Sequence, residues 1–394
     1  MSNLITTLKR LTPRAAFSLL LLTAGCSQDP IFDYISGETA PTNPIIRGSP
    51  SKMVRAVIDG REKLYVANGG IWEYDLDPHA PAAFWSSSPG PGGYVADLAS
   101  VSGASGDVLY ALAIGNATAQ VWQNNGNGWE ELDPPGDYGF IQNIFGAGDA
   151  LFATGAKADG DAYDYAILYK DSGGFRVVEE TAGIPVAGAL LTGAGKVGND
   201  YYLAARGKGI YKSSGSGSSL TLALETAAAS VPTDVAGLLQ AEADVIVGIS
   251  AGGYLVRVDA SGLKVDPTSL GGTYYSGALA LMDSPDPQDG YDKLLLLGYK
   301  TRSSSYQQGY MELQFKSDGT HDGTPLIPGE NQPSSVSDNQ QYDSSLRRYP
   351  VTALWVLEPA QAGEPSVIFA ATTNQGLYSY RNRSDGGWQW NHEE

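Results

Sequence analysis

Tyrosine and arginine gather in one polar stretch of the sequence. The residues there that could bind a ligand are Tyr306, Tyr342, Tyr349, Arg302, Arg347 and Arg348. A guanidinium pairs with carboxylates, and tyrosine stacks on planar sugar or peptide groups at low entropic cost. We therefore predict that these six residues form a partner-binding sector. Tyrosine is common in this chain, so some of these rings could instead cap the ends of strands.

Three carboxylates lie close together in a second, Gly-containing segment. Asp159, Asp161 and Asp164 could converge on a hard cation such as calcium, which prefers oxygen ligands. Their spacing does not match a complete calcium-binding loop, and a solvated acidic loop is the interpretation that we favour. The sequence therefore predicts no metal site and no cofactor, with these aspartates as weak candidates for a metal.

The elements that must position these residues follow from an internal repeat. Seven stretches each contain an apolar run, a short turn with glycine, and a strand with an aromatic or aliphatic residue at a matching place. The runs begin near Leu64, Val108, Leu151, Tyr201, Val245, Leu294 and Val367, and the matching residues are Trp72, Trp122, Tyr169, Tyr211, Val256, Leu313 and Tyr378. Repeats of roughly 40 to 50 residues with several short strands are typical of β-propeller blades. We expect the matching residues to pack blade against blade.

The sequence thus predicts an all-β fold, a seven-bladed β-propeller of four-stranded antiparallel blades over residues 53–394. The predicted blades are 53–87, 95–132, 141–180, 188–225, 235–266, 277–327 and 351–391. Residues 329–349, which are rich in Ser, Asn, Gln and Asp, form a predicted inserted loop between blades six and seven. Long loops without secondary structure are either functional or disordered.

One face of such a propeller carries the loops that join each outer strand to the next inner strand and each second strand to the third. We expect the six binding residues on this face, together with Arg206 and six further tyrosines. These are Tyr94, Tyr138, Tyr163, Tyr165, Tyr274 and Tyr275. Histidine is scarce, and we place His79 and His321 in loops between third and fourth strands, away from this face. A histidine-centred catalytic site is therefore not expected there.

The segment Ser384-Asp385-Gly386-Gly387-Trp388 resembles the Asp-box turn of sialidase-like propellers. Looser versions occur at residues 170–175 and 125–129. The resemblance implies a blade hairpin and leaves open a glycan-processing enzyme, in which an arginine cluster would bind the substrate carboxylate. The arginine-isoleucine-proline start that is typical of sialidases is missing. We therefore predict a protein without catalytic residues, with glycosidase-type activity as the alternative.

The N-terminus has the features of an export signal. Lys9, Arg10 and Arg14 precede an apolar segment that is too short to span a bilayer. Leu22-Thr23-Ala24-Gly25-Cys26 resembles the bacterial lipoprotein signal, which implies cleavage after residue 25 and acylation of Cys26, for example with palmitate. Cys26 is the only cysteine in the chain, so a disulfide within the chain is excluded.

Residues 26–52 contain four prolines and little periodicity, which predicts a flexible tether. Ile45 and Ile46 could instead add an outer strand to the last blade and close the ring. The formal net charge of −18 repels phosphate backbones and anionic lipid headgroups. We therefore expect no nucleic-acid partner, and attachment to a membrane through acyl chains only.

Together these features predict an exported, lipid-anchored repeat protein of the bacterial cell envelope, at the outer membrane or cell surface rather than the inner membrane. Its predicted role is a non-catalytic binding or scaffold module for a protein or glycan. A scaffold for envelope assembly is a further alternative, and it would need an exposed apolar patch.

Overall fold

The computed structural model describes residues 45–393 apart from sixteen gaps. These gaps are 77–84, 116–117, 134–135, 161, 172–173, 181–187, 216, 226–230, 271–272, 289, 302–307, 317–319, 324, 326–349, 359–365 and 383–387. The signal peptide, Cys26, most of the predicted tether and all of the predicted inserted loop therefore lie outside the described residues. In the part that is described, no helix is both long and apolar enough to cross a bilayer.

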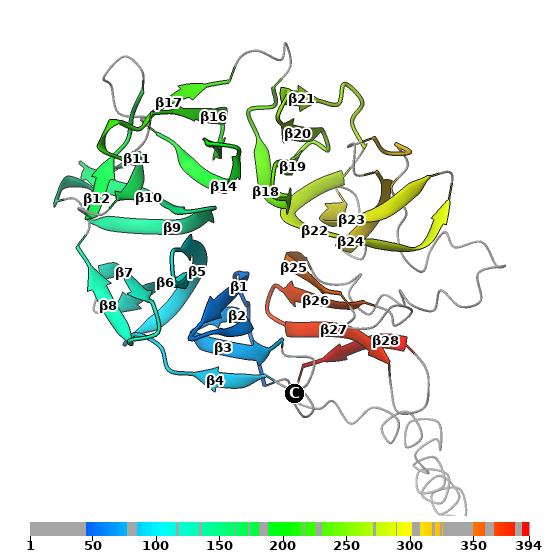
Figure 1. Cartoon of the computed structure of the whole chain (residues 1–394), viewed down its shortest axis with the longest axis horizontal. Coiled ribbons are helices and arrows are strands. Elements are labelled where there is room, and N and C mark those ends of the chain that lie inside the picture. The colour runs from blue at the N-terminus through cyan, green and yellow to red at the C-terminus, as the bar shows by residue number, and fades with distance from the viewer. Residues whose placement is uncertain are drawn as a thin grey trace, which may run out of the picture. The chain divides into compact units, whose positions relative to one another are not determined.

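The described residues belong to one compact unit, Pro44–Glu394, that forms a ring of seven sheets (Figure 1). Each sheet is built from consecutive, antiparallel strands, with one short parallel strand added to blade four, and the first of the consecutive strands lies nearest the centre of the ring. The prediction of a seven-bladed propeller is confirmed. The inner strands lie around the centre of the ring (Figure 1), and residues of several of them line a cavity there, the central channel.

Blades one to four contain seventeen strands and two short 3-10 helices. They are β1 (Met53–Ile58), β2 (Arg61–Asn68), β3 (Gly70–Asp75) and β4 (Ser86–Ser88); β5 (Tyr94–Gly103), β6 (Gly106–Gly115), β7 (Thr118–Asn124) and β8 (Trp129–Leu132); η1 (Gly136–Tyr138), β9 (Phe140–Ala147), β10 (Ala150–Asp159), β11 (Ala162–Asp171), β12 (Gly174–Val177) and β13 (Glu179–Glu180); β14 (Leu190–Val197), β15 (Asp200–Arg206), β16 (Gly209–Ser214), η2 (Gly217–Ser219) and β17 (Thr221–Leu224). The short β13 pairs in parallel with β17, so the end of blade three adds a fifth strand to blade four.

Blades five to seven contain the remaining eleven strands. They are β18 (Val235–Glu242), β19 (Val245–Ser250), β20 (Leu255–Asp259) and β21 (Gly262–Val265); β22 (Thr273–Gln288), β23 (Tyr291–Thr301) and β24 (Gln308–Phe315); β25 (Val351–Leu357), β26 (Val367–Thr372), β27 (Gly376–Asn382) and β28 (Trp388–His392). In the described residues blade six has three strands, and a single bridge between Phe315 and His321 follows its third strand.

Seven apolar clusters hold the blades together, one in each gap between neighbouring blades. Both faces of each blade are covered, so the second strands carry nearly continuous apolar runs, as in the buried pattern of β10 and β15. Six of the seven matching residues from the repeat lie in or against these clusters, as predicted. The seventh, Trp122, is half-buried and belongs to none of the seven clusters.

Polar side chains at the channel join one inner strand to the next. Asn143 Nδ2 donates to the carbonyl of Leu191 at 2.8 Å, and Thr192 Oγ1 donates to that of Val235 at 2.7 Å. Ser276 Oγ donates to the carbonyl of Val351 at 2.7 Å. The same arrangement continues from Thr352 Oγ1 to the carbonyl of Pro50, at 3.1 Å. We call these residues, with Lys52 and Asp97, the channel girdle.

The girdle residues Thr192, Ser276 and Thr352 lie at irregularities in the register of an inner strand with its neighbour. A β-bulge leaves a residue unpaired within its own ladder and can re-aim its side chain. Between blades five and six, a close approach of backbones takes the place of a girdle bond. A Cβ on Gly237 would collide with the Gly277 carbonyl, so only glycine fits at this crossing.

The last blade is complete without the N-terminal segment, because the C-terminal residues supply its outer strand β28. Residues 45–48 instead dock on the end of this blade. The Leu377 N–H donates to the carbonyl of Ile46 at 3.2 Å, and the Ile45 N–H donates to that of Glu393 at 2.9 Å. The Ile46 side chain is fully buried in the cluster between blades seven and one. The propeller therefore includes residues 45–52, which the sequence placed in the tether.

Candidate functional site

All six residues of the predicted binding sector lie outside the described residues. The same holds for Cys26 and for Asp161. The roles predicted for Tyr306, Tyr342, Tyr349, Arg302, Arg347 and Arg348 therefore stay predictions. Two of the segments that resemble an Asp-box lie at hairpins between a third and a fourth strand. Residues 125–128 join β7 to β8, and the segment 170–175 includes the end of β11 and the start of β12.

The two faces of the ring differ in exposed apolar surface. We call the face where the inner strands begin, and where second strands connect to third strands, the loop face. In the described residues the large exposed hydrophobic side chains are Ile45, Tyr94, Ile114, Phe140, Tyr163, Leu224 and Tyr254. Each of them lies at the loop-face end of its strand or turn. Large apolar side chains that are exposed to water on one face only are typical of a protein interaction site.

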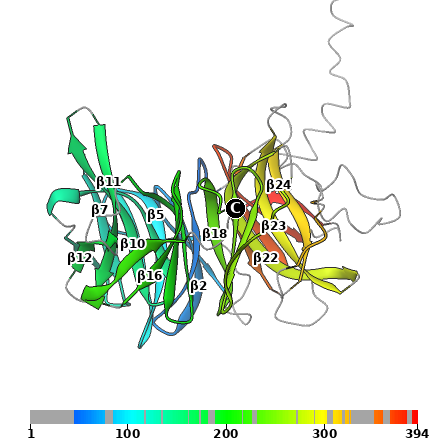
Figure 2. The same cartoon turned by 90° about the horizontal axis from the view of Figure 1, so that it is seen from above.

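The hairpin of β10 and β11 extends beyond its neighbours on the loop face. The inner strand β9 begins at Phe140, opposite Ala156. The pairs Lys157 with Asp164, Ala158 with Tyr163, and Asp159 with Ala162 continue the hairpin past this point. We call the described residues 157–160 and 162–164 the hairpin tip. Figure 2 shows β11 near the outer part of the ring, where this hairpin rises from the blade.

Two aromatic rings stack at the base of the hairpin tip. The ring centroids of Phe140 and Tyr163 lie 6.4 Å apart with an angle of 29° between the planes. Tyr163 is 59% exposed and Phe140 is 38% exposed. Stacking fixes the orientation of both rings while a large apolar area stays accessible. The pair is therefore a preformed contact surface.

The opposite side of the hairpin tip is acidic. Side chains alternate along a strand, and cross-strand partners share a face, so Asp159, Asp164 and Lys157 lie on the face away from Tyr163. The Tyr138 hydroxyl donates to Asp164 Oδ2 at 3.2 Å, and Lys157 Nζ lies 3.5 Å from Asp137 Oδ2. Partial burial, followed by the charge of Asp164, raises the pKa of Tyr138.

The predicted loop-face residues have different environments. Tyr94 and Tyr163 are more than half exposed, and Arg206 is also exposed. Tyr138 and Tyr165 are half-buried. Tyr275 is buried in the cluster between blades five and six, where its hydroxyl lies 3.7 Å from Met311 Sδ, so its placement on the exposed face was wrong. The cause is that β22 is covered by blade five on that side.

The weak metal site has no further support in the described part of the chain. Asp159 and Asp164 share one face of the hairpin tip, and Asp161 is not described. No group of three or more His, Cys, Asp or Glu residues that could hold a metal ion occurs in the residues that the structure describes.

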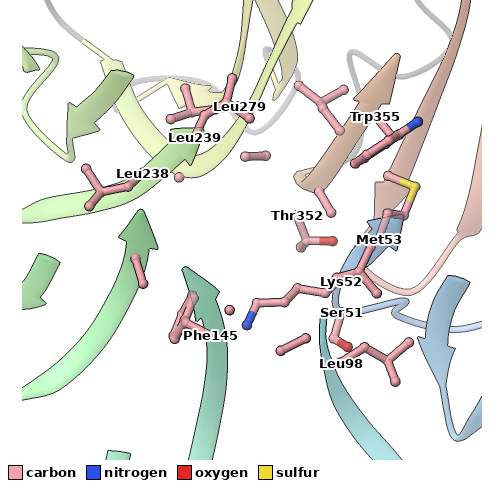
Figure 3. Close-up of a pocket in the computed structure, with 18 of the residues that line it drawn as sticks. Ser51, Lys52, Met53, Leu98, Phe145, Leu238, Leu239, Leu279, Thr352 and Trp355 are labelled. Carbon is pink, nitrogen blue, oxygen red and sulfur yellow. The ribbon is translucent and has the colours of Figure 1, made fainter. Parts of the chain in front are cut away.

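The central channel contains a cavity of about 490 Å³. Small side chains such as Ala99, Ala194 and Ala278 line much of it, and Lys52 extends into it near Phe145 (Figure 3). Enclosure of the Lys52 ammonium lowers its pKa, and the nearby Asp97 carboxylate opposes this effect. The ammonium is already engaged by Asp97 and the Ile144 carbonyl. Lys52 therefore works as a connector between blades.

A smaller cavity of about 280 Å³ lies between blades five and six. Its two lining cations, Arg257 and Lys264, both contact Asp259, at 3.3 and 3.2 Å. His321 Nε2 lies 2.5 Å from Asp266 Oδ2 at the same cavity. Each of these polar side chains thus has a partner within the protein.

Sequence reasoning missed Phe140, Ile114 and Lys52. Phe140 follows Tyr138 by two residues, and Tyr163 precedes Tyr165 by two. These two aromatic pairs on either side of a long hairpin were the available signal. Lys52 gave none, because it lay in the segment assigned to the tether.

No protein-family model matches the chain, and no curated protein matches it. Among solved structures, it is similar to a putative 6-phosphogluconolactonase from Bacteroides uniformis, with 11% identity, a TM-score of 0.47, and coverage of 82% of this chain and 92% of that chain. An ancestral GH74 enzyme has 13% identity and a TM-score of 0.48, over 89% of this chain and 47% of that one. YCF48 bound to D1 peptide has 11% identity and a TM-score of 0.46, over 88% and 97%. At these identities and TM-scores, the similarities assign neither a family nor an activity.

Proposed function

We propose that the chain is an exported, lipid-anchored propeller that binds a protein partner through its loop face and does not act on it chemically. The observation that carries this proposal is the one-sided distribution of exposed rings and aliphatic side chains in the described residues. Leaving this apolar area in water is unfavourable, and covering it with a partner removes that cost. An envelope-assembly scaffold would need the same kind of surface.

The fold supports a rigid platform. Apolar clusters fill every gap between blades, and girdle bonds join most of the inner strands. Binding at a rigid surface costs less conformational entropy than binding that must first order a loop of the propeller. In this proposal the predicted partner-binding sector adds contacts on the same face, through Tyr306, Tyr342, Tyr349, Arg302, Arg347 and Arg348.

The binding proposal is tested with the full chain as bait in a solubilised bacterial envelope. Tyr94→Ser combined with Tyr163→Ser is compared with Glu242→Gln combined with Asp244→Asn, which changes exposed residues at the opposite face. We expect the first variant to lose at least one retained protein while its thermal unfolding stays near that of the wild type. Equal retention by both variants would remove the loop face from the proposal.

The predicted partner-binding sector is tested by replacing Tyr342, Arg347 and Arg348 together with alanine and measuring the retained envelope proteins in the same way. Each retained sample is also assayed for release of reducing sugar. Release by the wild type would contradict a purely binding role and favour the glycan-processing alternative.

Export and lipidation are tested by Cys26→Ser. We expect the wild type to fractionate with membranes and to carry acyl chains on Cys26 as its first residue, by mass spectrometry. The variant should lose the acyl mass and move to the soluble fraction. An unmodified Cys26 in the wild-type protein would contradict the proposed anchor.

A further inference from the structure

The hairpin tip offers a cation two different kinds of contact. Tyr163 presents a largely exposed ring that is held in place by Phe140. The face of an aromatic ring carries negative potential and attracts ammonium and guanidinium groups. On the other side of the same hairpin, Asp159 and Asp164 present carboxylates. A partner that straddles the hairpin tip can therefore place positive groups on both sides.

The local charge favours a positive partner. In the described residues of the loop-face end of blade three, Asp137, Asp159 and Asp164 face a single ammonium, Lys157, which is paired with Asp137. The formal charge of the whole chain has the same sign, at −18. Like charges across an interface cost energy and slow encounter, whereas complementary charges accelerate it. Phosphorylated or carboxylate-rich segments are thus poor partners for this end of the blade.

We infer that the hairpin tip docks a lysine- or arginine-rich segment of a partner protein. This inference rests on the proposed function, and it narrows the partner from any protein to one with a basic segment. A cation stacks on Tyr163, and further cations pair with Asp159 and Asp164 across the hairpin. Each exposed contact of this kind is weak, on the order of 0.5 to 1 kcal/mol, so several must act together.

Neutral glycans are the principal alternative, because sugar rings also stack on exposed aromatic side chains. Such a ligand would use Tyr163 and be indifferent to the carboxylates. Removal of the carboxylates should therefore weaken the binding of a basic segment and leave the binding of a neutral glycan unchanged.

The probe is a fluorescein-labelled peptide of alternating lysine and glycine, and its binding to the full chain in non-ionic detergent is measured by fluorescence anisotropy. The same peptide with glutamate in place of lysine is the first control. The charge variant is Asp159→Asn with Asp164→Asn, and the ring variant is Tyr163→Ser. The matched control for charge is Glu242→Gln with Asp244→Asn, because it removes the same number of carboxylates from exposed sites on the opposite face.

We expect the charge variant and the ring variant each to weaken lysine-peptide binding by roughly fivefold, and the matched control by less than twofold. Binding of the glutamate peptide should be undetectable, and salt should weaken the lysine peptide in the wild type. An equal loss in the charge variant and its matched control would show attraction to overall charge and overturn the inference. So would an unchanged affinity in the Tyr163→Ser variant, or tight binding of a neutral oligosaccharide that Asp159→Asn and Asp164→Asn leave intact.

The outcome is separable from that of the proposed function. Capture of an envelope protein that depends on Tyr94 and Tyr163, combined with no preference for the lysine peptide, would overturn the basic-partner inference alone. Thermal unfolding of every variant is measured in parallel, and exposed positions are expected to leave it within about 1 °C to 3 °C of the wild type.

Discussion

The Lys52 ammonium lies 3.0 Å from the Asp97 carboxylate, and this ion pair connects the first three blades at the channel. Asp97 Oδ2 also accepts the Ile144 N–H at 3.0 Å, and the Lys52 ammonium lies 3.5 Å from the centroid of the Phe145 ring. Lys52 precedes β1, Asp97 belongs to β5, and the other two residues belong to β9. One side chain therefore joins three inner strands.

Lys52→Met should destabilise the propeller by about 1 to 3 kcal/mol, because it leaves the mostly buried Asp97 carboxylate without its cation. The check is chemical denaturation, with Lys264→Met as the control. The Lys264 side chain is 59% exposed, and its partner Asp259 keeps a second cation, Arg257, at 3.3 Å, so the loss of Lys264 should cost under about 1 kcal/mol. A double-mutant cycle with Asp97→Asn isolates the pair, and additive single effects would contradict the connecting role.

Glu312 predicts a dependence of stability on pH. It lies on β24, is 8% exposed, and its Oε1 atom has no hydrogen-bond partner. Burial raises the pKa of Glu312 to about 8, and a hydrogen bond with Tyr310 opposes this only in part. The folded protein therefore holds this proton more tightly than the unfolded chain, in which the pKa is near 4.5.

The contribution of protonated Glu312 is fully present below about pH 4.5 and is lost as the pH rises to about 8. Glu312→Gln cannot ionise, so its stability relative to the wild type should rise over this range by up to about 5 kcal/mol. Denaturation curves of both proteins at pH 5 to 9 measure this difference. A difference that is independent of pH would show that Glu312 does not titrate in this window.

The crossing of β18 and β22 requires glycine. Gly237→Ala should destabilise the protein by several kcal/mol, since its Cβ would overlap the Gly277 carbonyl and force two inner strands apart. Gly70→Ala is the matched control, because nothing lies within 4 Å of the Cβ that it would add. Thermal unfolding should separate the two variants clearly, and similar melting temperatures would argue against a close crossing.

The docked N-terminal segment should contribute to closure of the ring. Ile46→Ala removes a fully buried side chain from the cluster between blades seven and one, at a cost of about 2 to 4 kcal/mol. Its neighbour Ile45 is exposed, so Ile45→Ala should change the free energy of unfolding by less than about 0.5 kcal/mol. Denaturant titrations compare the pair, and equal effects would mean that the segment does not hold blades seven and one together.

The repeat in the sequence was sufficient to predict the fold, because second strands such as β10 and β15 are covered on both sides and carry uninterrupted apolar runs. The girdle could not be predicted in this way. Thr192 and Ser276 reach the next blade only because their strands are irregular in register, and tertiary packing determines where that happens. Glu312 was equally hidden, since a carboxylate between Met311 and Leu313 suggests an exposed position.

The candidate site was predicted in part. The loop face, Tyr94 and Tyr163 followed from the alternation of strands and turns, whereas the stacking of Phe140 on Tyr163 depends on how far two strands extend past a third. That extension is a property of the hairpin length relative to β9. Residue types alone do not reveal it.

The hydrogen bond from the Ile45 N–H to the Glu393 carbonyl places residue 45, where the described part of the chain begins, at the loop face. With acyl chains on Cys26, about 18 intervening residues would span roughly 25 Å as a flexible coil. Under the proposed lipidation, this short connection would limit how far the loop face can lie from the bilayer. Its partner would then have to enter a narrow, membrane-bounded space, which favours partners that are themselves embedded in or attached to the same membrane.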